Sequence, residues 1–209
     1  MIVSIPVYDE VDLLDVAGPH EVLKWVPDLE VRLVAGSVNM PVVTRDGLRF
    51  LATHSFDDDT AIDVLWVPGG NPGAMAPIMN GRGDGRYLDY ITRTAQTAQW
   101  VCSVCEGALL LAAAGLLDGY EATTHWNFLP CLKAFDKVKV VAGFPRFHLD
   151  RNRLTGGGIS SGLDESLELV RLLKGEFVAR NVQRVLRYYP VPPYPNDLQE
   201  PPKCMFDFS

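Results

Sequence analysis

The chain has 209 residues, of which 47% are hydrophobic and 22% charged, and its formal net charge is -7. This composition is ordinary for a globular protein with one sizeable core, and the negative charge argues against nucleic acid or an anionic membrane as a partner, since both attract basic surfaces. No segment approaches the roughly 20 apolar residues of a membrane span, and the apolar start of the chain is too short for a signal peptide, so we expect a cytoplasmic protein.

The first part of the chain predicts strands that alternate with helices. The predicted segments are strands at 2–7, 31–35 and 63–67, a helix at 18–26 and a hairpin across 41–53. The hairpin is indicated by Asp46-Gly47, a sequence typical of tight turns. Pro68-Gly69-Gly70 follows the third strand and ends it, because proline and two glycines interrupt regular structure.

The second part continues the alternation. It predicts a helix at 86–98, a strand running to Cys105 with a helix behind it, short strands at 122–124 and 138–141, a helix from 127, a hairpin at 146–155, and helices at 161–173 and 178–187. Such alternation predicts an α/β fold with a mainly parallel sheet and helices on both faces. We expect one domain over residues 1–189 and an irregular tail at 190–209, because prolines occupy positions 190, 192, 193, 195, 201 and 202.

Cys105 is the strongest candidate for a reactive residue. It follows the run Trp100-Val101-Cys102-Ser103-Val104 and precedes an alanine- and leucine-rich helical pattern. A sharp turn from strand to helix presents its turn residue at the end of a sheet, where the free N–H groups of the helix favour a thiolate. The alternative is an inert core residue, because free cysteine is often buried. We interpret Cys105 as an ionised nucleophile.

The neighbours of Cys105 allow competing interpretations. The backbone N–H of Glu106 can donate to an oxyanion, whereas its carboxylate opposes a thiolate if it points inward, so we expect it to point outward. Cys102 has the spacing of a redox pair with Cys105, but it lies inside the strand, which favours a core residue. The four cysteines indicate neither a disulfide framework nor a zinc site, and we expect no metal.

Further positions have both a structural and a functional interpretation. Asp15 is favoured as a helix cap, with a proton-carrying carboxyl near the thiol as the alternative. Gly70 forms a tight turn or offers an N–H to negative charge, and the two are compatible. His125 is favoured as structural, with pairing to the cysteine as the alternative. Gly156-Gly157-Gly158 lacks dinucleotide-loop spacing and indicates close packing.

Six segments of the chain occur in an order that is typical of one family. They are Leu14-Asp15-Val16-Ala17-Gly18-Pro19-His20-Glu21, Val67-Pro68-Gly69-Gly70-Asn71-Pro72-Gly73, Ser103-Val104-Cys105-Glu106-Gly107-Ala108, Ala113-Ala114-Gly115-Leu116-Leu117-Asp118-Gly119, Ala122-Thr123-Thr124-His125-Trp126 and Leu154-Thr155-Gly156-Gly157-Gly158-Ile159. With these segments the chain resembles the DJ-1/PfpI superfamily, and within it the isocyanide hydratase branch. The amidase-like regulatory domains of some transcription factors carry much the same set, and the tail beyond about Asn196 has no match.

The resemblance implies a fold, an assembly and a set of site residues. The implied fold is α/β, flavodoxin-like (class I glutamine amidotransferase-like) and doubly wound, in a homodimer that uses neither metal nor organic cofactor. Cys105 is then the nucleophile on a strained turn, Asp15 is the neighbouring acid rather than a cap alone, and Gly70 and Glu106 supply N–H groups. His125 is at most site-lining. The hydratases usually have threonine where this chain has Glu106, a difference that bears on the substrate.

The implied activity is a lyase reaction. The sulfur of Cys105 attacks the terminal carbon of an isocyanide, Asp15 helps to deliver a proton, and water releases an N-formamide from the thioimidate. One alternative is a sensor of ligands or oxidation without turnover, and another is a glyoxalase- or amidase-like relative. The Pro-rich tail stands where the regulators carry a basic DNA-binding unit, so the expected partners are a small-molecule substrate and a second copy of the chain, and neither nucleic acid nor a membrane.

Overall fold

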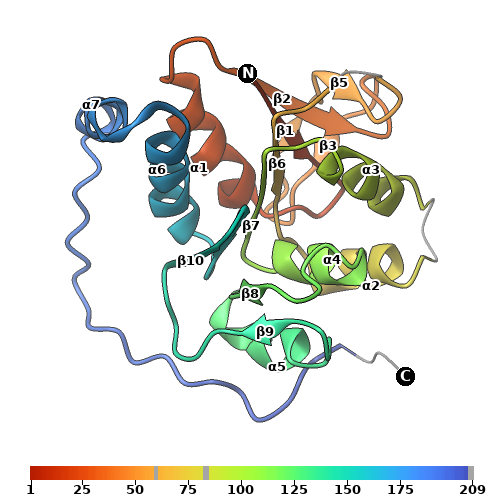
Figure 1. Ribbon diagram of the computed structural model, residues 1–209. Coiled ribbons are helices and arrows are strands. Elements are labelled where there is room, and N and C mark those ends of the chain that lie inside the picture. The colour runs from red at the N-terminus through yellow and green to blue at the C-terminus, as the bar shows by residue number, and fades with distance from the viewer. Residues whose placement is uncertain (59–60, 82–84, 207–209) are drawn as a thin grey trace.

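The computed structural model, which describes residues 1–58, 61–81 and 85–206, has a central sheet between two layers of helices (Figure 1). The strands of this sheet are β1 Ile2–Pro6, β2 Glu30–Ala35, β5 His54–Ser55, β6 Val64–Val67, β7 Trp100–Val104, β10 Phe147–Asp150 and β11 Arg153–Gly156. Their order is β10-β11-β7-β6-β1-β2-β5. Neighbouring strands are parallel except for the β10–β11 hairpin.

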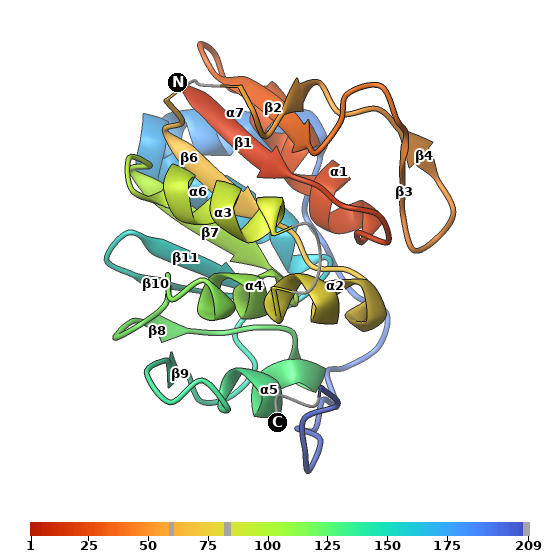
Figure 2. The same ribbon diagram turned by 90° about the vertical axis from the view of Figure 1, so that its right-hand side faces the viewer.

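The helices lie on both faces of the sheet. They are α1 Leu13–Lys24, α2 Pro72–Met79, α3 Arg86–Ala95, α4 Gly107–Ala113, α5 Leu129–Leu132, α6 Ser161–Lys174 and α7 Glu176–Leu186, with a 3-10 turn η1 at Trp126–Phe128. Helices α1, α6 and α7 cover one face, while α2, α3 and α4 cover the other (Figures 1 and 2). Because both faces are covered, every residue of β6 is buried. The doubly wound α/β fold predicted from the sequence is confirmed.

Two short pairs of strands lie outside the main sheet, one antiparallel and one parallel. Strands β3 Val42–Val43 and β4 Arg49–Phe50 are antiparallel and surround Gly47, whose φ of 84° fits the predicted Asp-Gly turn. Strands β8 Glu121–Ala122 and β9 Lys139–Val140 are parallel. Helix α2 and strand β5 were not predicted from the sequence.

Helix α1 begins earlier than predicted, and this changes the role of Asp15. The cap is Asp12, whose side chain accepts a hydrogen bond from the N–H of Leu14 at 3.2 Å. Pro19 therefore lies inside the helix, where it has no N–H to offer to the carbonyl four residues earlier. That carbonyl belongs to Asp15, and the indole N–H of Trp66 in β6 donates to it at 3.3 Å instead. The start of this helix at residue 18 was a wrong prediction.

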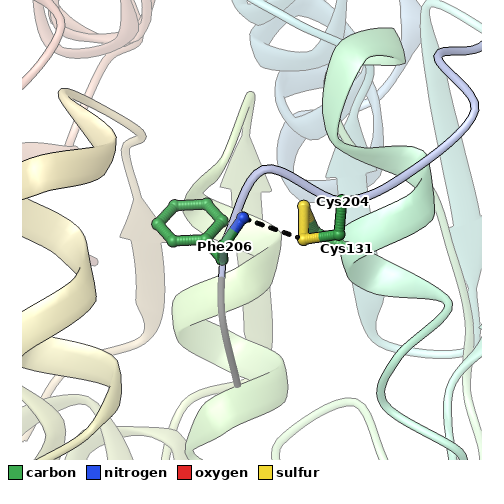
Figure 3. Close-up of a disulfide and its surroundings, with 3 residues drawn as sticks. All are labelled: Cys131, Cys204 and Phe206. Atoms are coloured by element: carbon green, nitrogen blue, oxygen red, sulfur yellow. Dashed lines mark hydrogen bonds between the residues drawn. A yellow bond between two sulfur atoms is a disulfide. The ribbon is translucent and has the colours of Figure 1, made fainter. Parts of the chain in front are cut away.

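The C-terminal tail has no helix or strand from Arg187 through Phe206, in agreement with its prolines. It runs along one side of the molecule to α5 (Figure 1), where Cys204 forms a disulfide with Cys131 (Figure 3). The expectation that the cysteines form no disulfide is wrong for this pair, which is 73 residues apart in sequence and is brought together only by tertiary folding.

Within the described part of the chain, no helix combines the length and the apolar character that crossing a bilayer requires.

Candidate functional site

Cys105 occupies the turn between β7 and α4, as the sequence predicted. Its φ of 56° is unusual for a residue with a side chain and stores strain in the turn. Two hydrogen bonds hold the backbone of Cys105. Its N–H donates to the carbonyl of Gly156 at 3.2 Å, and its carbonyl accepts the hydroxyl of Thr124 at 2.7 Å. A Cβ on Gly107 would lie 2.1 Å from the carbonyl oxygen of Val67, so only glycine lets α4 start this close to β6.

Two carboxyl groups surround the sulfur. Oxygen atoms of Asp15 and Glu106 and the sulfur of Cys105 all lie within 4.8 Å of one another, and all three residues are buried. One oxygen of Asp15 accepts the N–H of Gly69 at 2.9 Å. Among the described residues, the other oxygen of Asp15 and the Oε2 of Glu106 have no hydrogen-bond partner. The structure therefore brings Cys105 and Asp15 together, as the nucleophile interpretation requires, and adds the Glu106 carboxylate as a third group.

The prediction that the Glu106 side chain points outward is wrong. Its exposed fraction is 3%, and an oxygen of its carboxylate lies within 4.8 Å of the sulfur of Cys105. Gly69 provides the space, because a Cβ at that position would lie 2.5 Å from Oε2 of Glu106. The orientation depends on the approach of the turn after β6 to the start of α4, which the sequence around Glu106 does not encode.

The site favours a neutral thiol. Burial raises the pKa of Cys105 well above its ordinary value, and the nearby charges of Asp15 and Glu106 raise it further, while the backbone N–H of Ile159 acts in the opposite direction. Burial also raises the pKa of Asp15 well above the usual range, with contributions from the charges of Asp12 and Glu106. Burial and the nearby carboxyl groups therefore outweigh the effect of the helix start that was expected to favour a thiolate. The cluster holds protons that a reaction can redistribute.

The two backbone groups expected to stabilise charge, Gly70 and the N–H of Glu106, have different surroundings. Gly70 packs beside Tyr8: a Cβ on Gly70 would lie 2.9 Å from the tyrosine hydroxyl. The backbone N–H of Glu106 donates to the carboxylate of the same residue. The Tyr8 hydroxyl is buried, and within the described residues it has no hydrogen-bond partner. Sequence reasoning missed Tyr8, although it follows β1 at the carboxyl end of a parallel strand, where functional residues collect.

A cavity of about 740 Å³ lies beside Thr124, whose hydroxyl donates to the carbonyl of Cys105. Ile159 and His125 also lie in its wall, whereas Cys105 is 1% exposed and does not line it. His125 accepts the N–H of Asn127 at 3.3 Å and so caps η1, and burial lowers its pKa. His125 therefore has the structural role that the sequence favoured, and it also lines the cavity.

Cys102 and the three consecutive glycines have structural surroundings. Cys102 is a free, fully buried residue of β7, as the core interpretation predicted. A Cβ on Gly156 would lie 2.1 Å from an oxygen of Glu165, and one on Gly158 would lie 2.4 Å from the ring of His125. The close packing expected of the glycines is thereby confirmed. Glu165 is itself fully buried, and burial raises its pKa well above the ordinary value.

The chain is similar to several known proteins. Residues 1–172 match the model of the DJ-1/PfpI family. The isonitrile hydratase of Pseudomonas putida is 40% identical over 90% of this chain and 78% of its own length. A ThiJ/PfpI family protein from Pseudomonas syringae superposes with a TM-score of 0.83 at 32% identity, covering 92% of this chain and 77% of its own.

The regulatory relatives match a smaller share. GbdR of Pseudomonas aeruginosa, an HTH-type transcriptional regulator, is 28% identical over 68% of this chain, which corresponds to 37% of the regulator. DJ-1 of Schizosaccharomyces pombe shares the fold, with a TM-score of 0.75 and 16% identity over 91% of this chain and 100% of its own. From the family match over residues 1–172 and the 40% identity to an isonitrile hydratase, the chain belongs to the DJ-1/PfpI family.

Proposed function

We propose that this protein is a lyase that hydrates isocyanides to N-formamides, with Cys105 as a covalent nucleophile and Asp15 as its acid. The observation that carries the proposal is the buried thiol with two carboxyl groups within 4.8 Å, in a chain 40% identical to an isonitrile hydratase. Adding a thiol across the terminal carbon of an isocyanide requires one proton to leave sulfur and one to arrive at carbon. Two adjacent carboxyl groups suit such an exchange.

The proposed first step forms a thioimidate. The thiol proton of Cys105 passes to the carboxylate of Glu106, an oxygen of which lies within 4.8 Å of the sulfur, as the sulfur bonds to the terminal carbon of R–N≡C. Asp15, whose pKa burial raises, gives a proton to the same carbon. The product is R–N=CH–S–Cys105. One proton has moved from the site to the carbon, and the count on the two carboxyl groups is unchanged, since Glu106 has gained the thiol proton and Asp15 has lost its own.

The second step consumes water and resets the site. Water adds its oxygen to the thioimidate carbon and returns a proton to Asp15, while Glu106 protonates the nitrogen. The C–S bond of R–NH–CH(OH)–S–Cys105 then breaks, the hydroxyl proton moves to sulfur, and R–NH–CHO leaves. We propose the Gly70 N–H and the Glu106 N–H as groups that stabilise charge in this step, once the Glu106 carboxylate has released its own N–H.

The decisive experiment measures formamide produced from several alkyl and aryl isocyanides. Wild-type protein should produce it, Cys105→Ala should not, and Asp15→Asn should lose most of the rate. Intact mass after mixing with an isocyanide should show a transient adduct in the wild type and none in Cys105→Ser. Wild-type protein that is inert toward every isocyanide tested would refute the proposal.

A sensor of ligands or oxidation is the second candidate function, favoured by the regulators among the relatives. Against it, a thiol that burial and nearby carboxylates keep protonated is oxidised slowly. Peroxide-treated protein that acquires a binding partner only when Cys105 is oxidised, without turnover, would favour this alternative. A glyoxalase- or amidase-like activity remains a third candidate, selected by turnover of methylglyoxal above that of isocyanides.

The assembly and compartment are separate proposals. We propose a homodimer that takes a small-molecule substrate without nucleic acid, a membrane or a cofactor, and light scattering on the purified protein measures its mass directly. We also propose the cytoplasm as the compartment. Because disulfides are rare there, the bond between Cys131 and Cys204 makes this testable: thiol trapping during cell lysis should find it open in a reducing cytoplasm and closed in an oxidising compartment.

A further inference from the structure

The hydroxyl of Tyr8 lies close to the cysteine cluster and has no role in the two proposed steps. We propose that Tyr8 is a further catalytic residue, whose hydroxyl holds the water molecule that hydrolyses the thioimidate on Cys105. The inference rests on the proposed function and deepens it, because it assigns the water of the second step to a definite place in the fold.

The side chain of Tyr8 and the two carboxyl groups of the site meet at one turn. Tyr8 follows β1, and the turn follows β6, the strand beside it (Figure 2). A Cβ on Gly69 would lie 2.5 Å from Oε2 of Glu106 and 3.0 Å from Oδ2 of Asp15. A Cβ on the next residue, Gly70, would lie 2.9 Å from the hydroxyl of Tyr8. The hydroxyl and the carboxyl groups therefore approach adjacent residues, and both of these must be glycine for the side chains to come so close.

Polar atoms at this place lack partners in the protein. Among the described residues, the Tyr8 hydroxyl, Oδ1 of Asp15 and Oε2 of Glu106 have no hydrogen-bond partner, although all of these atoms are buried. Buried polar atoms are nearly always hydrogen-bonded, either to protein or to an ordered water. A buried water typically makes about three hydrogen bonds to such atoms, and this group supplies them.

The surroundings fix the Tyr8 ring and keep its hydroxyl neutral. The ring packs edge-on against that of Tyr87, with 5.2 Å between the ring centroids. Burial raises the pKa of Tyr8 well above its ordinary value. Nearby charges raise this pKa further, in the order Tyr87, Glu106, Asp15 and Cys105. The hydroxyl is therefore within electrostatic reach of the cysteine cluster, and it keeps its own proton at neutral pH.

A water held in this way is suited to the second step. It donates one O–H to the Asp15 carboxylate, which has lost its proton in the first step, and the other to the hydroxyl of Tyr8, so a lone pair of its oxygen is free to attack. The oxygen bonds to the thioimidate carbon, one water proton passes to Asp15, and Glu106 protonates the nitrogen. The product of this attack is R–NH–CH(OH)–S–Cys105, and Tyr8 has neither gained nor lost a proton.

The kinetics of Tyr8→Phe test the assignment, because phenylalanine keeps the ring and removes only the hydroxyl. The full chain is mixed with benzyl isocyanide, and quenched-flow intact mass follows the thioimidate, which adds the mass of one isocyanide. The adduct should form at the wild-type rate and decay at least about fivefold more slowly, the loss expected for one hydrogen bond to a reacting group. Decay at the wild-type rate, or an equal slowing of formation and decay, would overturn the inference.

Unfolding in urea separates a catalytic hydroxyl from a structural one. Tyr8→Phe should leave the free energy of unfolding unchanged, because the hydroxyl has no partner among the described residues. The matched control is Tyr90→Phe, since Tyr90 is only 5% exposed and its hydroxyl is hydrogen-bonded to that of Ser4 in β1 at 2.7 Å. This control should lower stability and leave the decay of the adduct unchanged. A Tyr8→Phe variant that loses stability without a longer-lived adduct would make the hydroxyl structural and end the inference.

A high-resolution crystal structure of the full chain tests the water site without turnover. In the wild type, an ordered water should lie within hydrogen-bond reach of the Tyr8 hydroxyl and Oδ1 of Asp15, and Tyr8→Phe should lose it. A wild-type site without this water, or a water that persists in the variant, would overturn the inference.

These measurements distinguish the inference from the proposed function. If the water is present but no isocyanide yields an adduct or a formamide, the proposed function fails and takes the hydrolytic role with it, while the water site stands. If isocyanides are hydrated and the adduct decays equally fast without the hydroxyl, the Tyr8 assignment fails and the function stands.

Discussion

Replacing Glu106 by glutamine tests whether its carboxylate opposes ionisation of Cys105. The two groups lie within 4.8 Å, and the carboxylate is only 3% exposed. At that separation, Coulomb repulsion between a thiolate and a carboxylate is about 0.9 kcal/mol with water-like screening and roughly 3.5 kcal/mol at the effective dielectric constant of about 20 that suits protein sites. Glutamine keeps the size of the side chain and removes the charge, so the thiolate becomes easier to form.

The expected result is faster alkylation of Cys105 by iodoacetamide at pH 7. Each ~1.4 kcal/mol corresponds to a factor of ten in thiolate population while the thiol is mostly protonated, so the rate should rise about fivefold to several hundredfold. Peptide mass spectrometry assigns the alkylated cysteine. The control is Glu168→Gln on α6, which removes a carboxylate that pairs with Arg171 on the helix surface and should leave the rate unchanged.

A slower or unchanged alkylation rate in Glu106→Gln would refute this reasoning. It would mean that Glu106 is itself protonated and donates to sulfur, in which case removing it withdraws support from the thiolate. Formamide production should in any case fall in this variant, because glutamine cannot receive the thiol proton in the proposed first step. A variant that alkylates faster and still hydrates at the wild-type rate would remove Glu106 from the mechanism while leaving its electrostatic effect intact.

Three further outcomes follow from buried contacts. Gly107→Ala should destabilise the protein by about 1–3 kcal/mol in urea unfolding, because the new Cβ would lie 2.1 Å from the carbonyl of Val67. Gly69→Ala should lose most of the hydration rate with a smaller loss of stability, since its Cβ would lie 2.5 Å and 3.0 Å from the two site carboxyls; full activity would contradict their proposed placement. The folded-state pKa of Glu165 is raised by burial, so the stability that its protonated form contributes is present at low pH and is lost as pH rises above the ordinary value of 4.5. Glu165→Gln should remove that loss, so its free energy of unfolding should rise relative to that of the wild type as pH rises. Unfolding at a series of pH values measures this, with exposed Glu176→Gln as the control.

Most of the fold could be predicted because the strands are continuous apolar runs and the hairpins carry turn residues. The Cys105 turn followed from the abrupt change of pattern after Val104. The prediction failed at the start of α1, where Pro19 was read as a first-turn residue. A proline is tolerated inside this helix only because Trp66, far away in sequence, satisfies the carbonyl of Asp15. The residues around Pro19 give no indication that Trp66 will lie beside the helix.

The amino-acid sequence by itself determined the alternation of strands and helices, the position of Cys105 at a strand-to-helix turn, and the family to which these segments are similar. Those features depend on residues that are neighbours along the chain. Tertiary structure alone decided that Glu106 turns inward, that the thiol is neutral, and that Cys204 returns to Cys131 and carries the tail across the cavity. Charge, burial and disulfide pairing depend on which groups meet in space, and here the groups that meet come from segments up to 91 residues apart, as from Asp15 to Glu106.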